Sequence, residues 1–565
     1  MTNPPYEIHD TDVLILGSGG AGLCAALHLA DAPRSPRVTL AVKGLFGKSG
    51  CTRMVQGGYN VVLQAPDSLD AHFRDTLAGG QWINDQELAW LLVSEAPGRV
   101  LELENRVGCF FDRAPDGTVH QKPFAGQSHD RTVHKGDLTG IEIVNRLSEQ
   151  VAATDTEILE EVRAVELLRD GNGRVVGALL LNLRTGGFIA ARARATLLAT
   201  GGGPTMYRIS APCHDKTCDG IAMGWRAGAT LRDMEMVQYH PTGLLAADSQ
   251  ITGTVLEEGL RGAGAYLVNG EGNRYMHLYD EREERATRDV VSRAGYMEIM
   301  AGRGTPEGGV LLDISHKGAE FVMGNFKGMT LRCRDVGYDL AREPVLVSPT
   351  AHFLMGGLTI DTSCRSDLEG LYVAGEDAGG VHGANRLGGN GVAESTVFGG
   401  LAGDVLAETA AGLPDPVLDT AQVEAMIEKA TAPLRREGAP TVYPLIEELK
   451  DTMWRKAGLV RDAAALREAV DDLGRLQEAW AGAGCPGAPG YNLGWWDWLN
   501  LENLLDVSQT IVACALARDE SRGSHYRSDQ PNRDESALYH LTLREGEAPA
   551  RRPVTLSRLR PEQAA

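Results

Sequence analysis

Histidine, arginine and glutamate side chains stand in glycine-rich, turn-like strings whose chemistry suits the binding of an organic acid. They are His240 in MVQYHPTG, His352 in TAHFLMGG, Arg386 in VHGANRLGGNG, Arg288 in RATRDVVSR, and Glu258 and Arg261 in LEEGLRGAG. A guanidinium binds a carboxylate through paired hydrogen bonds, and imidazoles can donate to the remaining oxygens. Each residue alone is more simply explained as structural. Together the histidines and arginines predict a buried anion site.

The elements that would position this site begin near the N-terminus. A short apolar run at 13–16 precedes a glycine turn, a helical stretch at about 21–30 and a second strand at 37–42. This strand, turn, helix and strand order is the context in which G-x-G-x-x-G lets the backbone approach a pyrophosphate at a helix N-terminus. The motif glycines are Gly17, Gly19 and Gly22. We therefore predict a dinucleotide site.

The end of the second strand bears on which dinucleotide binds. NAD sites usually carry an acidic residue there, which contacts the ribose. This chain has AVKG, so Lys43 occupies that place. The substitution argues against NAD and leaves FAD open.

Composition excludes several functional classes. The chain has 565 residues and a formal net charge of −21, which argues against nucleic acid, because such binding needs a basic face. No apolar run approaches the ~20 residues of a membrane span. The start, MTNPPYEIHDTD, lacks a basic segment and an apolar core, so we expect no secretory signal. Any membrane contact would come through a partner.

The cysteines predict neither a metal site nor a disulfide framework. All nine are scattered, and the closest pair is Cys213 and Cys218 in CHDKTC. Without further ligands nearby, this pair is a poor signal for a metal or an iron–sulfur cluster. Free thiols suit a reducing compartment, so we predict a cytoplasmic protein.

Periodicity predicts an interrupted α/β fold. A hairpin is expected at 175–199, turning at RTGG, and a short buried strand at 370–376. Strands so far apart suggest one nucleotide-binding domain at 1–241 and 351–415, interrupted by a capping domain at 242–350. Helical patterns dominate the C-terminal domain, residues 416–565. Its polar, proline-rich tail from Arg544 is expected to be loosely held.

Many ordered strings resemble one family over nearly the whole stretch from Asp12 to about Asp534. They are GSGGAG, QGG, DTLAGG, FAGQS, LRDMEMVQYHPTG, RGAG, RDVVSR, PTAHFLMGG, LYVAGE, HGANRLGGN and ESRGSHYRSDQPNRDE. The family is that of the flavoprotein subunits of succinate dehydrogenase and fumarate reductase, which also includes L-aspartate oxidase. The resemblance implies a Rossmann-like FAD-binding domain, an inserted mobile capping domain and a C-terminal helical domain.

The resemblance also implies roles for individual residues. Arg288 would exchange a proton with a substrate carbon, relayed by Glu258 and Arg261, while hydride passes between flavin N5 and the neighbouring carbon. Since a free arginine is essentially never deprotonated, that role requires a pre-organised relay. The implied substrate-binding residues are Phe124, His240, Glu257, His352 and Arg386. The implied FAD-binding residues are Gly17, Gly19, Gly20, Gly22, Lys43, Ser49, Cys51, Gly57, Gly58, Asp219, Glu376, Arg386 and Asn390.

Four positions bear on how closely the family pattern holds. Cys51 stands where covalently flavinylated members carry a histidine, and Gly391 where a serine is usual. A cysteine could form a thioether to the flavin, but its arm is short, so we predict non-covalent FAD with Cys51 packed beside the isoalloxazine. Glu257 replaces a threonine and would either repel a substrate carboxylate, or else turn away from it or pair with a nearby cation. Phe124 replaces the glutamate of aspartate oxidases, which argues for a substrate without an amine.

Three hypotheses follow. The leading one is a flavin subunit that acts on a fumarate- or succinate-type dicarboxylate and works with an iron–sulfur subunit. The second is a stand-alone oxidase of the L-aspartate oxidase kind, or a relative that acts on a different small acid. The third is a flavin-binding subunit whose site has drifted towards an assembly or electron-relay role.

Overall fold

The computed structural model describes residues 5–247, 249–536 and 538–563. Its largest sheet has the strand order β6-β2-β1-β9-β8-β7, and β16 adds to β9. Strands β1, β2, β6, β9 and β16 pair in parallel, and β7 and β8 are antiparallel to their neighbours. The strand bounds are β1 Tyr6–Leu16, β2 Val38–Val42, β6 Glu157–Glu160, β7 Val162–Arg169, β8 Val175–Asn182, β9 Phe188–Leu198 and β16 Leu371–Val373. The predicted hairpin and the late buried strand are thus confirmed.

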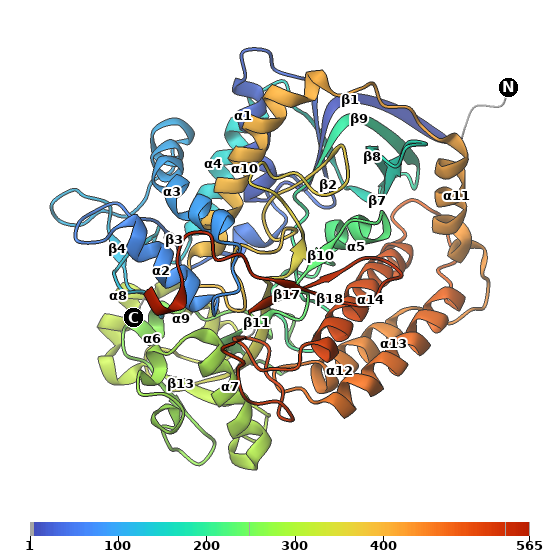
Figure 1. The fold of residues 1–565 in the computed structure, drawn as a ribbon. Helices are drawn as coiled ribbons and strands as arrows, with labels where there is room; N and C mark the ends of the chain where they lie inside the picture. Colours follow the sequence, from blue (N-terminus) through green and yellow to red (C-terminus); the bar gives the residue numbers. More distant parts are fainter. Residues whose placement is uncertain (1–4, 248, 537, 564–565) are drawn as a thin grey trace.

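Two helices beside this sheet pack closely against each other because a glycine lies at their contact. Helix α1 (Gly20–Asp31) follows β1 and packs against α10 (Asn390–Thr409) (Figure 1). A Cβ at Gly399 of α10 would lie 2.4 Å from the Ala21 carbonyl oxygen, so only glycine permits this approach. The other helices of this region are α2 (Leu69–Gly79), α3 (Gln86–Glu102), α4 (Thr139–Ala152) and α5 (Asp219–Arg226).

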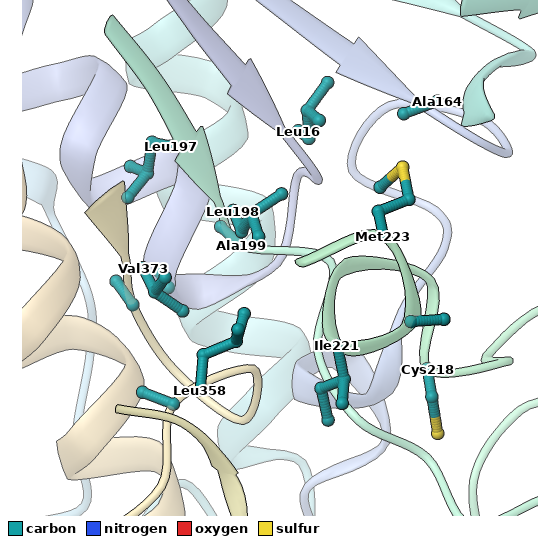
Figure 2. Close-up of a cluster of buried hydrophobic side chains, with 14 of the residues drawn as sticks. Leu16, Ala164, Leu197, Leu198, Ala199, Cys218, Ile221, Met223, Leu358 and Val373 are labelled. Carbon is teal, nitrogen blue, oxygen red and sulfur yellow. The ribbon is translucent and has the colours of Figure 1, made fainter. Parts of the chain in front are cut away.

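Apolar side chains fill the space at the carboxyl ends of the central strands. Figure 2 shows Leu16 of β1, Leu198 of β9 and Val373 of β16 near Ile221 of α5. All four side chains are essentially inaccessible to solvent. Because these strands end at one edge of the sheet, the loops that follow them converge, and this is where a ligand of an open α/β sheet binds.

A second unit has its own sheet, in the order β11-β14-β13-β12, and its own apolar core between Leu244 and Val347. The strands are β11 Val237–Leu244, β12 Tyr266–Val268, β13 Val310–Asp313 and β14 Val345–Leu354, and the helices include α6 Gly259–Gly262, α7 Arg288–Glu298, α8 Ala319–Asn325 and α9 Lys327–Arg334. A separate core supports our proposal of a capping domain at 242–350. Both proposed boundaries fall inside paired strands, β11 and β14, which therefore link the two units.

Helices dominate the region after 416, as predicted. They are α11 Thr420–Thr431, α12 Tyr443–Lys456, α13 Ala463–Gly482 and α14 Leu493–Ala517. Asp462 caps α13 and Asn492 caps α14 through their side-chain oxygens. The indole rings of Trp480 and Trp498 stack 4.3 Å apart and join these two helices. Figure 1 shows α12, α13 and α14 side by side along one side of the molecule.

The prediction of a loosely held tail from Arg544 is wrong. Strand β18 (Ala550–Pro553) pairs with β17 (Tyr539–Leu543), which in turn pairs with β10 (Leu231–Arg232). Further on, Gln86 of α3 accepts hydrogen bonds from the backbone N–H groups of Arg558 and Leu559. Polar composition did not reveal this because the tail is held by backbone pairing to a distant strand rather than by apolar burial.

Within the described ranges, no helix combines the length and apolarity needed to cross a bilayer. All nine cysteines are free thiols. Among the residues with described positions, no group of three or more histidine, cysteine or carboxylate side chains is placed to hold a metal ion.

Candidate active site

One cavity of about 180 Å³ joins the glycine turn after β1 to the two histidines of the second sheet. The FAD-binding region contributes Gly19, Gly20, Cys51, Gly57, Gly58, Glu376 and Arg386 to its wall. Residues from the cap and from the strands that link it contribute His240, Glu257, Glu258, Arg288 and His352. The structure therefore brings together residues predicted for the cofactor and residues predicted for the substrate.

A second, smaller cavity lies on the other side of the glycine turn. It shares Gly19, Ala199, Gly201 and Lys216 with the first, and Gly17, Lys43, Ser49 and Asp219 line it. Lys43 Nζ lies 3.0 Å from an Asp219 carboxylate oxygen and donates to Thr217 Oγ1 at 2.7 Å. Burial lowers the pKa of Lys43 to about 8 despite the neighbouring Asp219. Two adjoining cavities about a glycine turn suit the two halves of a dinucleotide.

The glycine turn has the geometry that a pyrophosphate requires. Gly17 has φ +110°, and a Cβ there would lie 2.2 Å from the Ala199 carbonyl oxygen. Gly19 precedes the first turn of α1, so the N-terminus of this helix faces the cavity wall that Gly19 and Gly20 form. Gly22 lies outside both cavities and serves packing, since its Cβ would lie 1.9 Å from the Gly17 carbonyl oxygen. This cradle fits FAD.

Gly22→Ala should therefore deprive the protein of FAD. The added methyl group collides with the backbone of Gly17, and the turn cannot open without moving the helix N-terminus. We expect most of the flavin to be lost, measured as flavin absorbance per mole of purified protein. Gly98→Ala is the matched control, because a Cβ at this glycine of α3 meets nothing within 4 Å. Stoichiometric FAD in a folded Gly22→Ala variant would contradict the assignment of the turn.

Two further predicted cofactor residues have clear positions. Glu376 accepts hydrogen bonds from the backbone N–H groups of Gly203 and Leu354, and burial raises its pKa to about 8. Asn390 begins α10, and its side chain is hydrogen-bonded to the side chains of Asn60 and Thr76. The cavity wall at this point is formed by the neighbouring Gly389 and Gly391, and Asn390 itself does not line it.

The two site histidines lie on paired strands of the second sheet. His240 of β11 and His352 of β14 have ring centroids 5.6 Å apart. The backbone N–H of Thr242 donates to His240 Nδ1 at 3.3 Å, which fixes the ring and leaves Nε2 available. Burial, reinforced by nearby guanidinium groups, holds the pKa of both histidines well below the ordinary range. Both rings are therefore neutral at pH 7 and can donate one hydrogen bond without adding charge.

Arg386 is a buried cation that faces the same cavity. Its guanidinium lies 4.4 Å from the ring centroid of Phe353, and Nη1 donates to the Leu387 carbonyl at 3.4 Å. Over the described parts of the chain, no carboxylate forms a salt bridge with Arg386, and its Nε has no hydrogen-bond partner. Burial lowers the pKa of Arg386 to about 9. A buried guanidinium without a counter-charge is a site for an anionic group.

Arg288, Glu258 and Arg261 form one buried network. Arg288 Nε and Nη2 donate to a single Glu258 oxygen at 2.8 and 2.6 Å. Arg261 Nη2 lies 3.6 Å from the other Glu258 oxygen, which also accepts a hydrogen bond from the backbone N–H of Ala125. Burial opposes the charge on Glu258, but the two arginines hold its pKa below the ordinary value. The network thus connects the cavity to a carboxylate that is ionised and hydrogen-bonded on both oxygens.

Glu257 lines the cavity and is paired with a cation. Lys122 Nζ lies 3.3 Å from a Glu257 oxygen, and the same ammonium lies 5.8 Å from the ring centroid of Phe124. Burial outweighs the attraction of Lys122 and raises the pKa of Glu257. Of the two interpretations of Glu257, pairing with a cation is the one that the structure bears out.

Sequence inspection missed several residues of the site. Gln238 accepts from Arg288 Nη1 at 3.1 Å and donates to the Arg386 carbonyl at 2.7 Å, so it links the two arginines. Asn60 donates to the Gly388 carbonyl at 2.6 Å and thereby holds the loop that carries Arg386. Gln238 lies within the string MVQYHPTG, two residues before His240. For Asn60 and Lys122 the sequence offers no local signal, because their partners are distant in the chain.

Comparison with family models agrees with this geometry. The model described as "FAD binding domain" matches residues 12–392, and the one described as "Fumarate reductase flavoprotein C-term" matches residues 446–564. The first covers the glycine turn and every residue of the cavity wall discussed above. The second covers α13, α14 and the paired tail strands.

Relatives and solved structures match over nearly the full chain. The "Fumarate reductase flavoprotein subunit" of Mycobacterium tuberculosis is 36% identical over 97% of this chain and 98% of its own length. The "L-aspartate oxidase" of Synechocystis sp. is 35% identical over 94% of this chain and 96% of its own. A mutant of the E. coli quinol fumarate reductase FrdA matches with a TM-score of 0.93 and 32% identity, covering 99% of both chains. The chain therefore belongs to the flavoprotein family of fumarate reductase and succinate dehydrogenase, and it is an FAD-dependent oxidoreductase of the fumarate reductase flavoprotein type.

Proposed function

We propose that this flavoprotein exchanges hydride between FAD and a small dicarboxylate of the fumarate or succinate type. The observation that carries the proposal is the buried Arg386 guanidinium, which faces the cavity without a carboxylate partner among the described residues. Neutral His240 and His352 lie on the same wall and can each donate a hydrogen bond. Such a set binds one carboxylate group of a substrate by charge and by directional bonds.

FAD, when bound, supplies a two-electron hydride donor or acceptor at the substrate. Arg288 would hold and move the proton at the substrate carbon next to the one that exchanges hydride. Glu258 orients the Arg288 guanidinium through two hydrogen bonds and is the base that would accept its proton. Arg261 lies beside the other Glu258 oxygen and would pass the proton outward. Closure of the cap would exclude water from this network.

A stand-alone amino-acid oxidase is the second candidate function. Glu257 is a carboxylate in the cavity wall, as recognition of a substrate ammonium would need. Lys122 already neutralises that carboxylate, and Phe124 adds an apolar wall beside it. An ammonium group would therefore have to displace Lys122, and we favour a substrate without an amine.

The Lys122–Glu257 pair provides a test between these candidates. Glu257→Gln removes a negative charge and leaves Lys122 unpaired, so the half-saturating concentration of a dicarboxylate should fall by about 3- to 10-fold. The double variant Glu257→Gln with Lys122→Met should lose this gain. Steady-state kinetics with fumarate, succinate and L-aspartate would measure the half-saturating concentration for each variant. A rise in half-saturation for every dicarboxylate, or loss of an L-aspartate activity, would favour the amino-acid oxidase.

The form of FAD attachment is a separate prediction. Cys51 lines the cavity, but its short side chain demands a close approach to the flavin methyl group, so we expect non-covalent FAD. After acid precipitation the yellow colour should stay in the supernatant. Colour that remains with the pellet, and is lost from the pellet in Cys51→Ser, would establish a thioether instead.

We further propose that an iron–sulfur protein is a partner of this chain. Flavin that has been reduced by two electrons must be reoxidised, and the described part of this chain brings together no group of three or more cysteine, histidine or carboxylate side chains that could hold a metal. Relatives from M. tuberculosis and E. coli are named as subunits of fumarate reductases, which supports an assembly. Co-purification of an iron–sulfur protein from the native source is the expected result. A monomer or homo-oligomer with full activity towards oxygen would contradict it.

A further inference from the structure

Two cysteines far apart in sequence meet at the main cavity, whose wall includes Cys51. Cys51 begins the short 3-10 turn at Cys51–Met54, and Cys213 lies in the loop that leads to α5. Their sulfur atoms are 3.8 Å apart. Both side chains are partly exposed, whereas the other seven cysteines are buried. Cys51 also lines the cavity, but lining the cavity does not require a second thiol in contact with Cys51.

The surroundings of the pair make one thiol a nucleophile. The thiol of Cys213 hydrogen-bonds to Cys51, and together with the nearby Lys216 ammonium this lowers the pKa of Cys51 to about 7 although burial opposes it. The same contact, with burial, raises the pKa of Cys213. The contact therefore favours ionisation of the Cys51 thiol over that of Cys213, which is the asymmetry of a redox-active dithiol.

The geometry also permits a bond between the two sulfur atoms. A disulfide has a sulfur separation of about 2.05 Å, so the atoms must approach by about 1.8 Å from their present contact. Cys51 and Cys213 lie in a short turn and a loop rather than in paired strands, so closing the bond breaks no strand pairing at either residue. His214, beside Cys213, is exposed, so a small reagent can reach this side of the pair.

We propose that Cys51 and Cys213 are a reversible redox-active dithiol, which small-molecule disulfides oxidise to an intramolecular disulfide in the wall of the cofactor cavity. The Cys51 thiolate attacks one sulfur of the reagent RSSR, forms a mixed disulfide and expels RS⁻. The mixed disulfide no longer carries the Cys51 negative charge, so Cys213 loses its proton more readily. The Cys213 thiolate then attacks the Cys51 sulfur and expels the second RS⁻. Overall, two cysteine thiols and RSSR give one protein disulfide and two RSH.

This site gives the flavoprotein a response to thiol status that is independent of its acid substrate. The disulfide would draw the Cys51 sulfur towards Cys213 and so alter the wall that faces FAD. Because the chemistry involves only these two thiols and the reagent, it does not depend on which small acid the enzyme uses.

The FAD-loaded protein should be incubated with oxidised glutathione, alkylated and digested without reduction. We expect the loss of two thiols, a peptide pair linked through Cys51 and Cys213, and full reversal by dithiothreitol. Cys51→Ser and Cys213→Ser should each abolish the linked pair. Cys485→Ser is the control, since this buried cysteine has a raised pKa and should leave the linkage unchanged.

Three results would overturn the proposal. One is a stable glutathione adduct on Cys51 without closure to Cys213. Another is a disulfide between Cys213 and Cys218. The third is the absence of thiol loss in both the FAD-loaded protein and protein stripped of FAD, since the stripped protein removes any shielding by the flavin. None of these readouts uses turnover, so failure here leaves the proposed dicarboxylate activity untouched.

Discussion

We expect Arg288→Ala to abolish turnover while FAD stays bound. Arg288 lies at the start of α7 in the second unit, and its guanidinium contacts Glu258 and Gln238 rather than the glycine turn. Loss of a positioned acid or base typically costs about 10²- to 10⁴-fold in rate. Arg288→Lys should fail similarly, because an ammonium cannot reproduce the two hydrogen bonds to one Glu258 oxygen.

Turnover with artificial electron carriers and flavin absorbance per mole of protein would measure both parts of this result. Arg293→Ala is the matched control on the same helix, since the Arg293 guanidinium lies 4.8 Å from the ring centroid of Tyr526 and lines a different cavity. It should leave turnover unchanged. Loss of FAD from the folded Arg288→Ala protein, or turnover close to that of the parent, would show that Arg288 does not have the role proposed here.

The second large effect is on substrate binding. Arg386→Ala removes the buried cation that faces the cavity, and truncating one partner of a desolvated charge pair costs about 2–5 kcal/mol. The half-saturating substrate concentration should therefore rise by roughly 30-fold to several thousand-fold, since each 1.4 kcal/mol is a factor of about ten. His240→Ala should act in the same direction but less strongly, because a neutral imidazole contributes a hydrogen bond without a charge.

The Arg386 experiment needs a control that removes charge elsewhere. Arg342 has a side chain that is 76% exposed on the second unit, so Arg342→Ala should leave half-saturation unchanged. Equilibrium titration of the oxidised flavin with a non-reacting dicarboxylate would measure affinity without turnover. Unchanged affinity in Arg386→Ala and in His240→Ala would rule out the proposed carboxylate site.

Sequence motifs predicted those parts of the site whose turns and residue types are encoded by short stretches of sequence. The glycine turn at Gly17 and Gly19, the histidines on β11 and β14, and Arg288 with Glu258 line the two adjoining cavities. Each depends on a backbone geometry or a residue type that a short string encodes. The hairpin and the C-terminal helices were predictable for the same reason, because their periodicity is local.

Contacts between distant segments could not be predicted. Lys122 neutralises Glu257 across 135 positions, and Cys213 meets Cys51 across 162. The tail is held at Gln86, more than 470 positions earlier in the chain. No periodicity or composition reports such pairs, because only the three-dimensional packing of the elements brings them together. The two interpretations of Glu257 stayed open because its partner is distant in the chain. The tail was wrongly predicted to be loose for the same reason.

The most direct test of the proposed function is the oxidation of chemically reduced, FAD-loaded protein by fumarate under anaerobic conditions, followed by flavin absorbance. We predict that fumarate reoxidises the flavin with one equivalent of succinate formed, and that Arg288→Ala loses this reaction while keeping its FAD. Succinate should reduce the oxidised protein in the reverse direction, to an extent set by the flavin potential. A flavin that fumarate cannot oxidise and succinate cannot reduce, but that L-aspartate does reduce, would contradict a dicarboxylate enzyme.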